Sequence, residues 1–305
     1  MKNRKKILVV GGTGFLGYHL IKDVLKKGWQ VTSISTNKPK KIRRLEKVKY
    51  LICDISKKNS LSLLKENYNY VINFGGYVDH KNKKKTYQSH YIGCKNLANY
   101  FLNKDIENFI QLGSSIEYGF IKSPQNEQSK TKPINVKSTY GKSKLLATNY
   151  LIKLYKTKGF PVTILRLYLA YGPYQDINRL IPITIKSCLK DLNFDTSMGR
   201  QKRDFVYISD VINLILKTLN NKKSLGQIFN VGSGKATSVK KIIQYIRKKL
   251  KKGRPNYGRI KLRRDELLEL YPKISKAKNL LKWKPRVNLY NGLNKTINFY
   301  KFNSN

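Results

Sequence analysis

Acidic residues are scarce in this chain of 305 residues. Asp and Glu number 17 against 63 Lys and Arg, which gives a net charge of +46. A surplus of this size suits nucleic acid or an anionic membrane surface. However, 50 of the basic residues are Lys and only 13 are Arg, and the basic runs are scattered along the chain. None is interleaved with aromatics as in an RNA-binding sheet. We therefore expect no specific nucleic-acid partner, whereas acidic small molecules such as nucleotides remain natural ligands.

Cysteine and long apolar runs are also rare. Cys53, Cys94 and Cys188 are too few and too far apart for a disulfide framework, and neither they nor the three histidines have metal-ligand spacing. We expect no metal and a reducing, cytoplasmic location. No apolar run approaches the roughly 18 residues of a membrane span, and no signal-peptide pattern follows the basic start, so a soluble protein without membrane insertion is expected. Hydrophobic residues make up 40% of the chain, which excludes a disordered one.

Strand and helix patterns alternate through the first half of the chain. Strands are expected at 6–10, 31–35, 50–53, 70–74, 108–113 and 162–167, and helices at 15–27, 90–102 and 138–156. Repeated βα units predict an α/β fold, a Rossmann-type doubly wound parallel sheet with a smaller C-terminal substrate lobe. The expected domains are 1–170, with a return segment at about 203–235, and a lobe formed by 171–202 and 236–305.

A glycine-rich loop, GGTGFLG, follows the first expected strand and opens the first helix. Its glycines Gly11, Gly14 and Gly17 would allow a tight turn, a close approach of pyrophosphate and close packing of helix on strand. This context predicts dinucleotide binding. The expected cofactor contacts in the loop are Gly11, Thr13, Gly14, Phe15, Leu16 and Gly17.

The end of the second strand bears on the choice of dinucleotide. Sites that prefer NAD usually place a carboxylate there, but this chain has Ser35, Thr36 and Asn37, followed by the basic run 38–44. Small hydroxyls and cations suit a 2′-phosphate, so NADP is slightly favoured over NAD. Asp54, followed by Ile55 after the third strand, could hold the adenine edge, although a lone Asp in a loop is more often a turn residue.

Candidate acid–base residues gather after the glycine loop. Tyr140 and Lys144 lie four residues apart and share one face of the expected helix, while Ser114 and Ser115 end a strand at the ligand-binding edge. A nearby ammonium favours the phenolate, and a serine hydroxyl can bind the reacting oxygen. Together Ser114, Tyr140 and Lys144 could move a proton while a nicotinamide moves hydride.

Taken in order, the motifs resemble the extended short-chain dehydrogenases/reductases, the NAD-dependent epimerase/dehydratase family that acts on nucleotide sugars. The resemblance covers nearly the whole chain. It rests on GGTGFLG (11–17), CDI (53–55), VINFGG (71–76), LGSSIEYG (112–119), YGKSK (140–144), LRLYLAYGP (165–173), NRLIP (178–182), RDFVYISDV (203–211), FNVGSG (229–234) and SKAKNLLKWKP (275–285).

This resemblance implies roles for particular residues. Ser114 (or Ser115), Tyr140 and Lys144 would form the active triad, with Lys144 also holding the cofactor ribose. Phe74 and Gly75 would line the cofactor. Arg203 and Arg179 would contact the nucleotide diphosphate, and Ser115 the substrate. Relatives often dimerise through a helix bundle that includes the Tyr-Lys helix, so a homodimer is expected.

Departures from the family pattern narrow the reaction. Family 4,6-dehydratases carry an Asp-Glu pair after the active hydroxyl, where this chain has Ser115 and Ile116. Glu117 comes one position late and should face differently on a strand. His90 and Leu169 stand where the family often has Asn.

Several functions therefore stay open. The main ones are a C4 epimerase and a reductase of a 4-keto-6-deoxy sugar, since both use the same triad. The missing carboxylate at the second strand favours the NADPH-using reductase weakly. The alternatives are a 4,6-dehydratase and a nonenzymatic NADP-binding scaffold, against which the intact triad argues.

Overall fold

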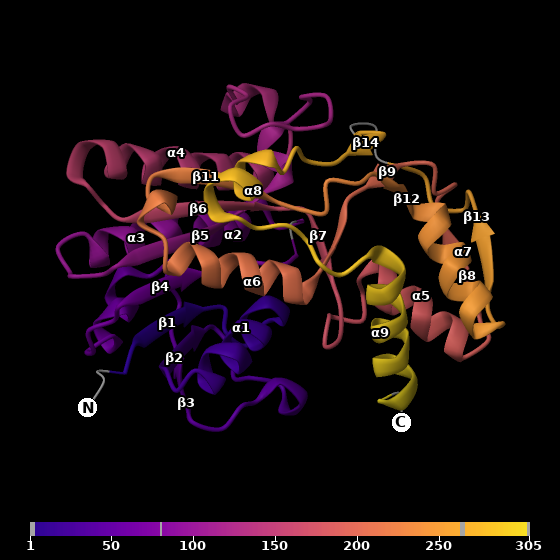
Figure 1. The fold of residues 1–305 in the computed structure, drawn as a ribbon, viewed down its shortest axis with the longest axis horizontal. Helices are drawn as coiled ribbons and strands as arrows, with labels where there is room; N and C mark the ends of the chain where they lie inside the picture. Colours follow the sequence, from indigo (N-terminus) through magenta and orange to yellow (C-terminus); the bar gives the residue numbers. More distant parts are fainter. Residues whose placement is uncertain (1–3, 80, 263–265, 304–305) are drawn as a thin grey trace.

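Seven parallel strands form the central sheet in the computed structural model, which describes residues 4–79, 81–262 and 266–303 (Figure 1). The strand order is β11-β6-β5-β4-β1-β2-β3. The bounds are β1 Lys6–Val10, β2 Gln30–Ser35, β3 Val48–Ile52, β4 Tyr70–Asn73, β5 Asn108–Ser114, β6 Val162–Leu167 and β11 Gln227–Val231. The order reverses between β1 and β4, which is where ligands bind in such sheets. The predicted α/β doubly wound fold is confirmed.

Buried apolar residues alternate along the strands because a parallel sheet is covered on both faces. On β1, Ile7 and Val9 face one core, and Leu8 and Val10 face the other. The first core includes apolar residues of α1 (Phe15–Lys26) and α6 (Ile208–Leu219). The second includes residues of α3 (Gly93–Phe101) and α4 (Thr139–Lys158). Each fully buried large apolar side chain contributes about 1.5–3 kcal/mol to folding.

The helix expected at 90–102 begins earlier and is not uniform. An α-helical turn, α2 (Lys83–Tyr87), leads into a π-helical turn, η3 (Gln88–Ile92), and then into α3. Asn82 begins α2, since its side chain accepts a hydrogen bond of 2.9 Å from the Lys85 amide. This cap is visible in the sequence, whereas the π turn, which packs against α4, has no comparable sequence signal.

Helix α4 has clear signals at both ends. The Ser138 hydroxyl accepts a hydrogen bond from the Gly141 amide at 3.1 Å, and Gly159 ends the helix in the left-handed conformation, with a φ of 65°. These two residues set the helical register that places Tyr140 in the first turn and Lys144 one turn later.

The remaining elements lie mostly to one side of the sheet, at the right in Figure 1. The helices are α5 Leu180–Leu189, α7 Val239–Leu250, α8 Ser275–Leu281 and α9 Leu289–Phe302. The strands are β7 Leu169–Tyr171, β8 Asn193–Thr196, β9 Lys202–Arg203, β10 Phe205–Tyr207, β12 Thr237–Ser238, β13 Arg254–Tyr257 and β14 Glu269–Leu270. Short 3-10 turns are η1 Lys41–Arg43, η2 Lys58–Leu63, η4 Ser115–Tyr118, η5 Pro133–Asn135 and η6 Lys222–Ser224.

An aromatic contact joins α1 to these later elements. His19 on α1 donates a hydrogen bond from Nε2 to the carbonyl oxygen of Pro173 at 2.9 Å, and its ring meets that of Tyr174 edge-on. Tyr174 packs in turn on Phe299 of α9. Burial lowers the pKa of His19, so the neutral ring is favoured at this junction.

Candidate active site

The glycine loop has the geometry that its sequence predicts. Gly11 has a φ of +73°, and its carbonyl oxygen accepts a hydrogen bond from the Gly14 amide at 3.0 Å, which closes a tight turn. A Cβ on Gly17 would lie 2.5 Å from the Gly11 oxygen, so helix and strand approach closely there. Gly14 caps α1 without any side-chain hydrogen bond to the first helical amides. Those amides can therefore receive an anion.

Hydroxyl groups and one paired cation surround the loop. The side chains of Thr13 and Ser35 hydrogen-bond to each other at 3.0 Å, at the end of β2. Arg43, which is buried, donates to the Thr13 carbonyl and forms an ion pair with Asp176. The positive charge of Arg43 is thus partly balanced in this structure. The loop residues Phe15 and Leu16 are partly buried against the sheet.

The chain after β4 crosses directly over the glycine loop. A Cβ on Gly11 would lie 3.1 Å from the carbonyl carbon of Phe74, so the two segments meet at the point where the strand order reverses. Ile55 packs close to Gly75. The carboxylate of Asp54 accepts hydrogen bonds from the Ser56 amide at 3.0 Å and the Ser56 hydroxyl at 2.7 Å. Asp54 therefore caps its own turn.

Ser114, Tyr140 and Lys144 lie together beside this crossing. Ser114 ends β5, and its side chain is close enough to that of Tyr140 to lower the pKa of the phenol. Lys144 is buried, and its Nζ donates to the carbonyl oxygen of Leu112 at 2.8 Å. The structure thus brings together a hydroxyl, a phenol and an ammonium from β5 and α4.

Two opposing effects act on the acid–base groups. Burial raises the pKa of Tyr140; the Ser114 side chain opposes this shift, the Glu117 carboxylate adds to it, and the charge of Arg179 opposes it least. Burial lowers the pKa of Lys144, and the nearby Glu117 carboxylate opposes that shift. Arg179 is exposed at the start of α5, so its cation is close enough to act on Tyr140 and accessible to a ligand.

The side chain of Glu117 faces inward, but Glu117 does not lie on a strand, so the expected alternation of side chains along a strand does not determine its direction. Residues 115–118 form the 3-10 turn η4 rather than a continuation of the strand. The Glu117 side chain is fully buried and accepts hydrogen bonds from the Ser114 amide (2.7 Å), the Thr148 hydroxyl (2.9 Å) and Arg166 Nε (2.9 Å). Both oxygens of the carboxylate therefore accept hydrogen bonds from protein groups, and one of these bonds fixes the backbone of Ser114.

Ser115 and Arg203, the other residues predicted to bind substrate, lie in different parts of the structure. Ser115 is buried within η4, next to Ser114. Arg203 lies on β9, where it donates to the carbonyl of Lys202 at 2.7 Å and pairs with Glu266. Its guanidinium is therefore held by protein groups in this structure.

One residue beside Tyr140 was not assigned a role from the sequence. His90 on η3 is buried, and its ring meets the Tyr140 ring edge-on with centroids 4.9 Å apart. The sequence signal was its departure from the family's usual Asn, but only the fold shows which ring it touches.

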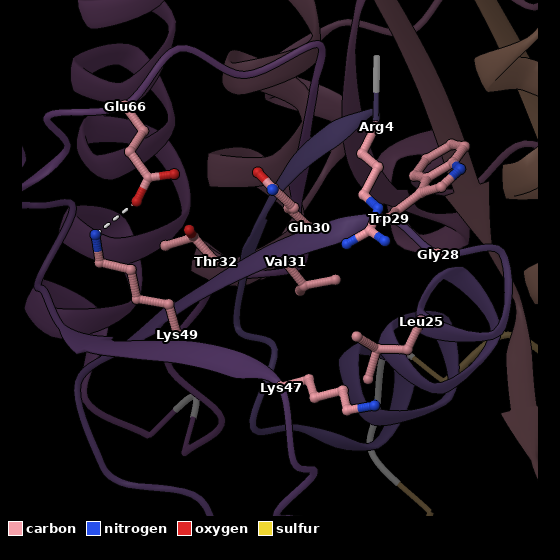
Figure 2. A pocket seen from close by; sticks show the side chains of 10 residues that line it. All are labelled: Arg4, Leu25, Gly28, Trp29, Gln30, Val31, Thr32, Lys47, Lys49 and Glu66. Carbon is pink, nitrogen blue, oxygen red and sulfur yellow. Dashed lines mark hydrogen bonds and ion pairs between the residues drawn. The ribbon is translucent and has the colours of Figure 1, made fainter. Parts of the chain in front are cut away.

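A hollow of about 560 Å³ lies at the opposite, amino-terminal edge of the sheet (Figure 2). Its lining includes Arg4, Trp29 and Lys47, together with the exposed ion pair of Lys49 and Glu66. None of the candidate acid–base residues lines it.

In the part of the chain that the structure describes, no group of three His, Cys, Asp or Glu side chains could hold a metal ion. Within the same residues, no helix is long and apolar enough to span a membrane.

Comparison with known proteins decides the family. The sequence pattern of the NAD dependent epimerase/dehydratase family matches residues 7–232, which contain the glycine loop, the Ser114 strand and the Tyr140 helix. The chain belongs to this family. Curated members resemble the chain over nearly all of its length. A Methanocaldococcus jannaschii protein named "Putative UDP-glucose 4-epimerase" is 30% identical and aligned over 98% of this chain and 99% of its own. The Salmonella muenchen CDP-abequose synthase is 27% identical, over 96% and 97%.

Solved structures of epimerase/dehydratase family members have the same fold. UDP-glucuronic acid 4-epimerase from Bacillus cereus, in complex with UDP-glucuronic acid and NAD, is 25% identical with a TM-score of 0.86, over 97% of this chain and 99% of its own. UDP-glucose 4-epimerase from Thermotoga maritima, with UDP-glucose, is 22% identical with a TM-score of 0.90, over 98% and 100%.

Proposed function

We propose that this chain is an NAD(P)-dependent nucleotide-sugar epimerase. The observation that carries the proposal is the placement of Ser114 close enough to Tyr140 to affect its pKa, with Lys144 buried one helical turn further along α4 and a dinucleotide-type glycine loop in the same half of the chain. Tyr140 would accept the proton of a sugar hydroxyl and later return it. Ser114 would hold the sugar oxygen, and Lys144 would favour the phenolate electrostatically and hold the cofactor ribose.

The glycine loop suits a dinucleotide. The uncapped amides at the start of α1 would bind the pyrophosphate, with Gly11, Thr13, Gly14, Phe15, Leu16 and Gly17 around it. Phe74 and Gly75 would line the nicotinamide side, and Asp54 and Ile55 the adenine side. The nicotinamide supplies a hydride acceptor and donor. Bacillus cereus UDP-glucuronic acid 4-epimerase holds NAD, and the pairing of Arg43 with Asp176 leaves less free charge for a 2′-phosphate. Both points support NAD.

The nucleotide diphosphate of the substrate would lie between two arginines. Arg179 is exposed, and its charge already acts on Tyr140, so a diphosphate bound to it would be close to the reacting sugar. Arg203 would join the diphosphate by exchanging its Glu266 partner for phosphate oxygens. Ser115, adjacent to Ser114, would complete the contacts to the sugar.

A 4-keto-sugar reductase is the second candidate. Ser35 stands where NAD sites usually have a carboxylate, which favours NADPH. A 4,6-dehydratase is disfavoured because Ile116 replaces an acid and Glu117 is committed to Arg166. A nonenzymatic scaffold would have no use for the Ser114–Tyr140 pair.

Three further features belong to the same proposal. Residues 1–170 and about 203–235 would bind the dinucleotide, and residues 171–202 and 236–305 the sugar nucleotide. A homodimer would form through a bundle that includes α4. The three cysteines are free, buried thiols, which suits the cytoplasm.

Identification of the retained nucleotide tests the proposal. The freshly purified protein is denatured, and any released nucleotide is identified and quantified by mass spectrometry. Nearly one NAD per chain would support an epimerase that recycles its cofactor. NADP, or an empty site that binds NADPH on titration, would favour the reductase instead. An empty site that binds neither dinucleotide would contradict both.

A further inference from the structure

His90 is held at a fixed orientation beside the candidate acid–base tyrosine. Its Nε2 lies 3.1 Å from the carbonyl oxygen of Tyr77, and its ring plane is inclined by 76° to that of Tyr140. A carbonyl oxygen only accepts hydrogen bonds, so Nε2 carries the proton in this contact. Edge-to-face geometry at this separation is the favoured arrangement of two rings.

Two local features of the backbone make room for this ring. A Cβ on Gly76 would lie 1.9 Å from His90 Cε1, so only glycine at that position admits the imidazole. The π-helical turn η3 carries His90 and packs against α4, the helix of Tyr140. Such turns are frequent at functional sites because the additional residue per turn redirects side chains.

The ring contact with His90 restrains Tyr140 in a way that a contact at its hydroxyl oxygen does not. A contact at the hydroxyl restrains that oxygen atom, whereas the plane of a phenol ring is set by its side-chain torsions. A ring packed edge-on against one face restricts these torsions. The same histidine reaches the 75–77 segment, which begins where Phe74 and Gly75 cross the glycine loop.

We propose that His90 is a positioning residue for Tyr140: its ring holds the phenol in the orientation that lets the hydroxyl meet Ser114, and Nε2 ties that ring to the segment beside the cofactor loop. The inference rests on the proposed function, because it assigns the residue that orients the acid–base group of that reaction. A misplacement of about 1 Å in such a group can cost about 100-fold in rate.

Three substitutions separate the ring from the hydrogen bond. His90→Ala removes both, His90→Phe keeps an aromatic ring without a donor, and His90→Asn keeps an amide donor without a ring. We expect kcat to fall about 10- to 100-fold in the Ala and Asn variants and to stay within about fivefold in the Phe variant. KM and the dinucleotide Kd should stay within about threefold in all three. Gln88→Ala, at an exposed position of the same turn, is the control.

Titration of Tyr140 gives a second readout that does not need turnover. The phenolate absorbance of Tyr140 is isolated by subtracting the spectrum of a matched Tyr140→Phe protein at each pH. Since burial raises the pKa of Tyr140, loss of the His90 ring should lower it in the Ala and Asn variants and not in the Phe variant.

The outcomes are distinct. An unchanged kcat in the Ala variant, recovery by Asn, or failure of Phe to exceed Ala would overturn the positioning role. If the wild-type protein converts no nucleotide sugar, the proposed function fails. The titration then decides the inference alone, and an unchanged pKa of Tyr140 in the Ala variant overturns it.

Discussion

Removing one partner of the buried Glu117–Arg166 ion pair should destabilise the fold strongly, although the pair takes no direct part in the reaction. The side chains of Glu117 and Arg166 are 0% and 2% exposed, and the two charges are 2.9 Å apart. Glu117→Ala would leave the guanidinium buried without its counter-charge, which typically costs about 3–5 kcal/mol. With an unfolding entropy of about 2.1 cal/mol/K per residue, 305 residues convert this into a Tm decrease of about 5–8 °C.

Urea unfolding followed by circular dichroism measures the effect. The double variant Glu117→Met/Arg166→Met removes both charges and leaves only the Ser114 amide and the Thr148 hydroxyl without their acceptor, at about 1–3 kcal/mol each. We therefore expect it to be more stable than Glu117→Ala. Glu46→Ala, at an exposed position, should change stability by less than about 0.5 kcal/mol.

Two results would refute this reasoning. The first is a loss below about 1 kcal/mol for Glu117→Ala, which would mean that the pair is not buried as described. The second is a folded, stable Glu117→Gln protein that loses nearly all turnover, which would make the carboxylate an acid of the reaction. We expect this Gln variant to keep activity within about tenfold per folded molecule, because its amide oxygen still accepts from the Ser114 amide.

Further predictions concern the loop, the cofactor and the junction with α9. Gly17→Ala should destabilise the protein by about 1–3 kcal/mol in urea, because its Cβ would lie 2.5 Å from the Gly11 oxygen; an unchanged midpoint would contradict the close packing. Ser35→Asp should shift the ratio of NADP to NAD dissociation constants at least about tenfold toward NAD, and titration calorimetry would expose an unchanged ratio. Burial lowers the pKa of His19 below the unfolded value of about 6.5. The contribution of the neutral His19 ring to stability should therefore be complete above that pH and should be lost as the pH falls through the lower, folded pKa. In His19→Gln this part of the pH dependence should be absent, and its persistence would assign it to another group.

Local sequence patterns predicted the parts of the site that are built from neighbouring residues. The strand-loop-helix at the glycine loop follows from a short apolar run, spaced glycines and a helical period. The register that puts Tyr140 and Lys144 on one face follows from α4 being regular between Ser138 and Gly159.

Contacts between distant residues could not be predicted in this way. The ion pair of Arg203 with Glu266 joins residues 63 positions apart, and that of Arg43 with Asp176 joins residues 133 apart. Glu117 lies on a 3-10 turn, and its carboxylate pairs with Arg166 of the neighbouring strand, 49 positions away. Likewise, His90 lies on a π turn that packs against α4, whereas helical periodicity predicted a regular helix at this position.

The acid–base role of Tyr140 is tested most directly by nuclear magnetic resonance of the sugar product. Wild-type protein, Tyr140→Phe and the exposed control Tyr155→Phe on the same helix are incubated with NAD, NADPH and a panel of UDP-, dTDP-, GDP- and CDP-sugars. We expect wild-type and Tyr155→Phe proteins to change the configuration or oxidation state at C4 of one sugar at similar rates. Tyr140→Phe should be slower by about 10²- to 10⁴-fold, with the same Tm. Conversion by Tyr140→Phe at the wild-type rate would contradict the acid–base role assigned to this tyrosine.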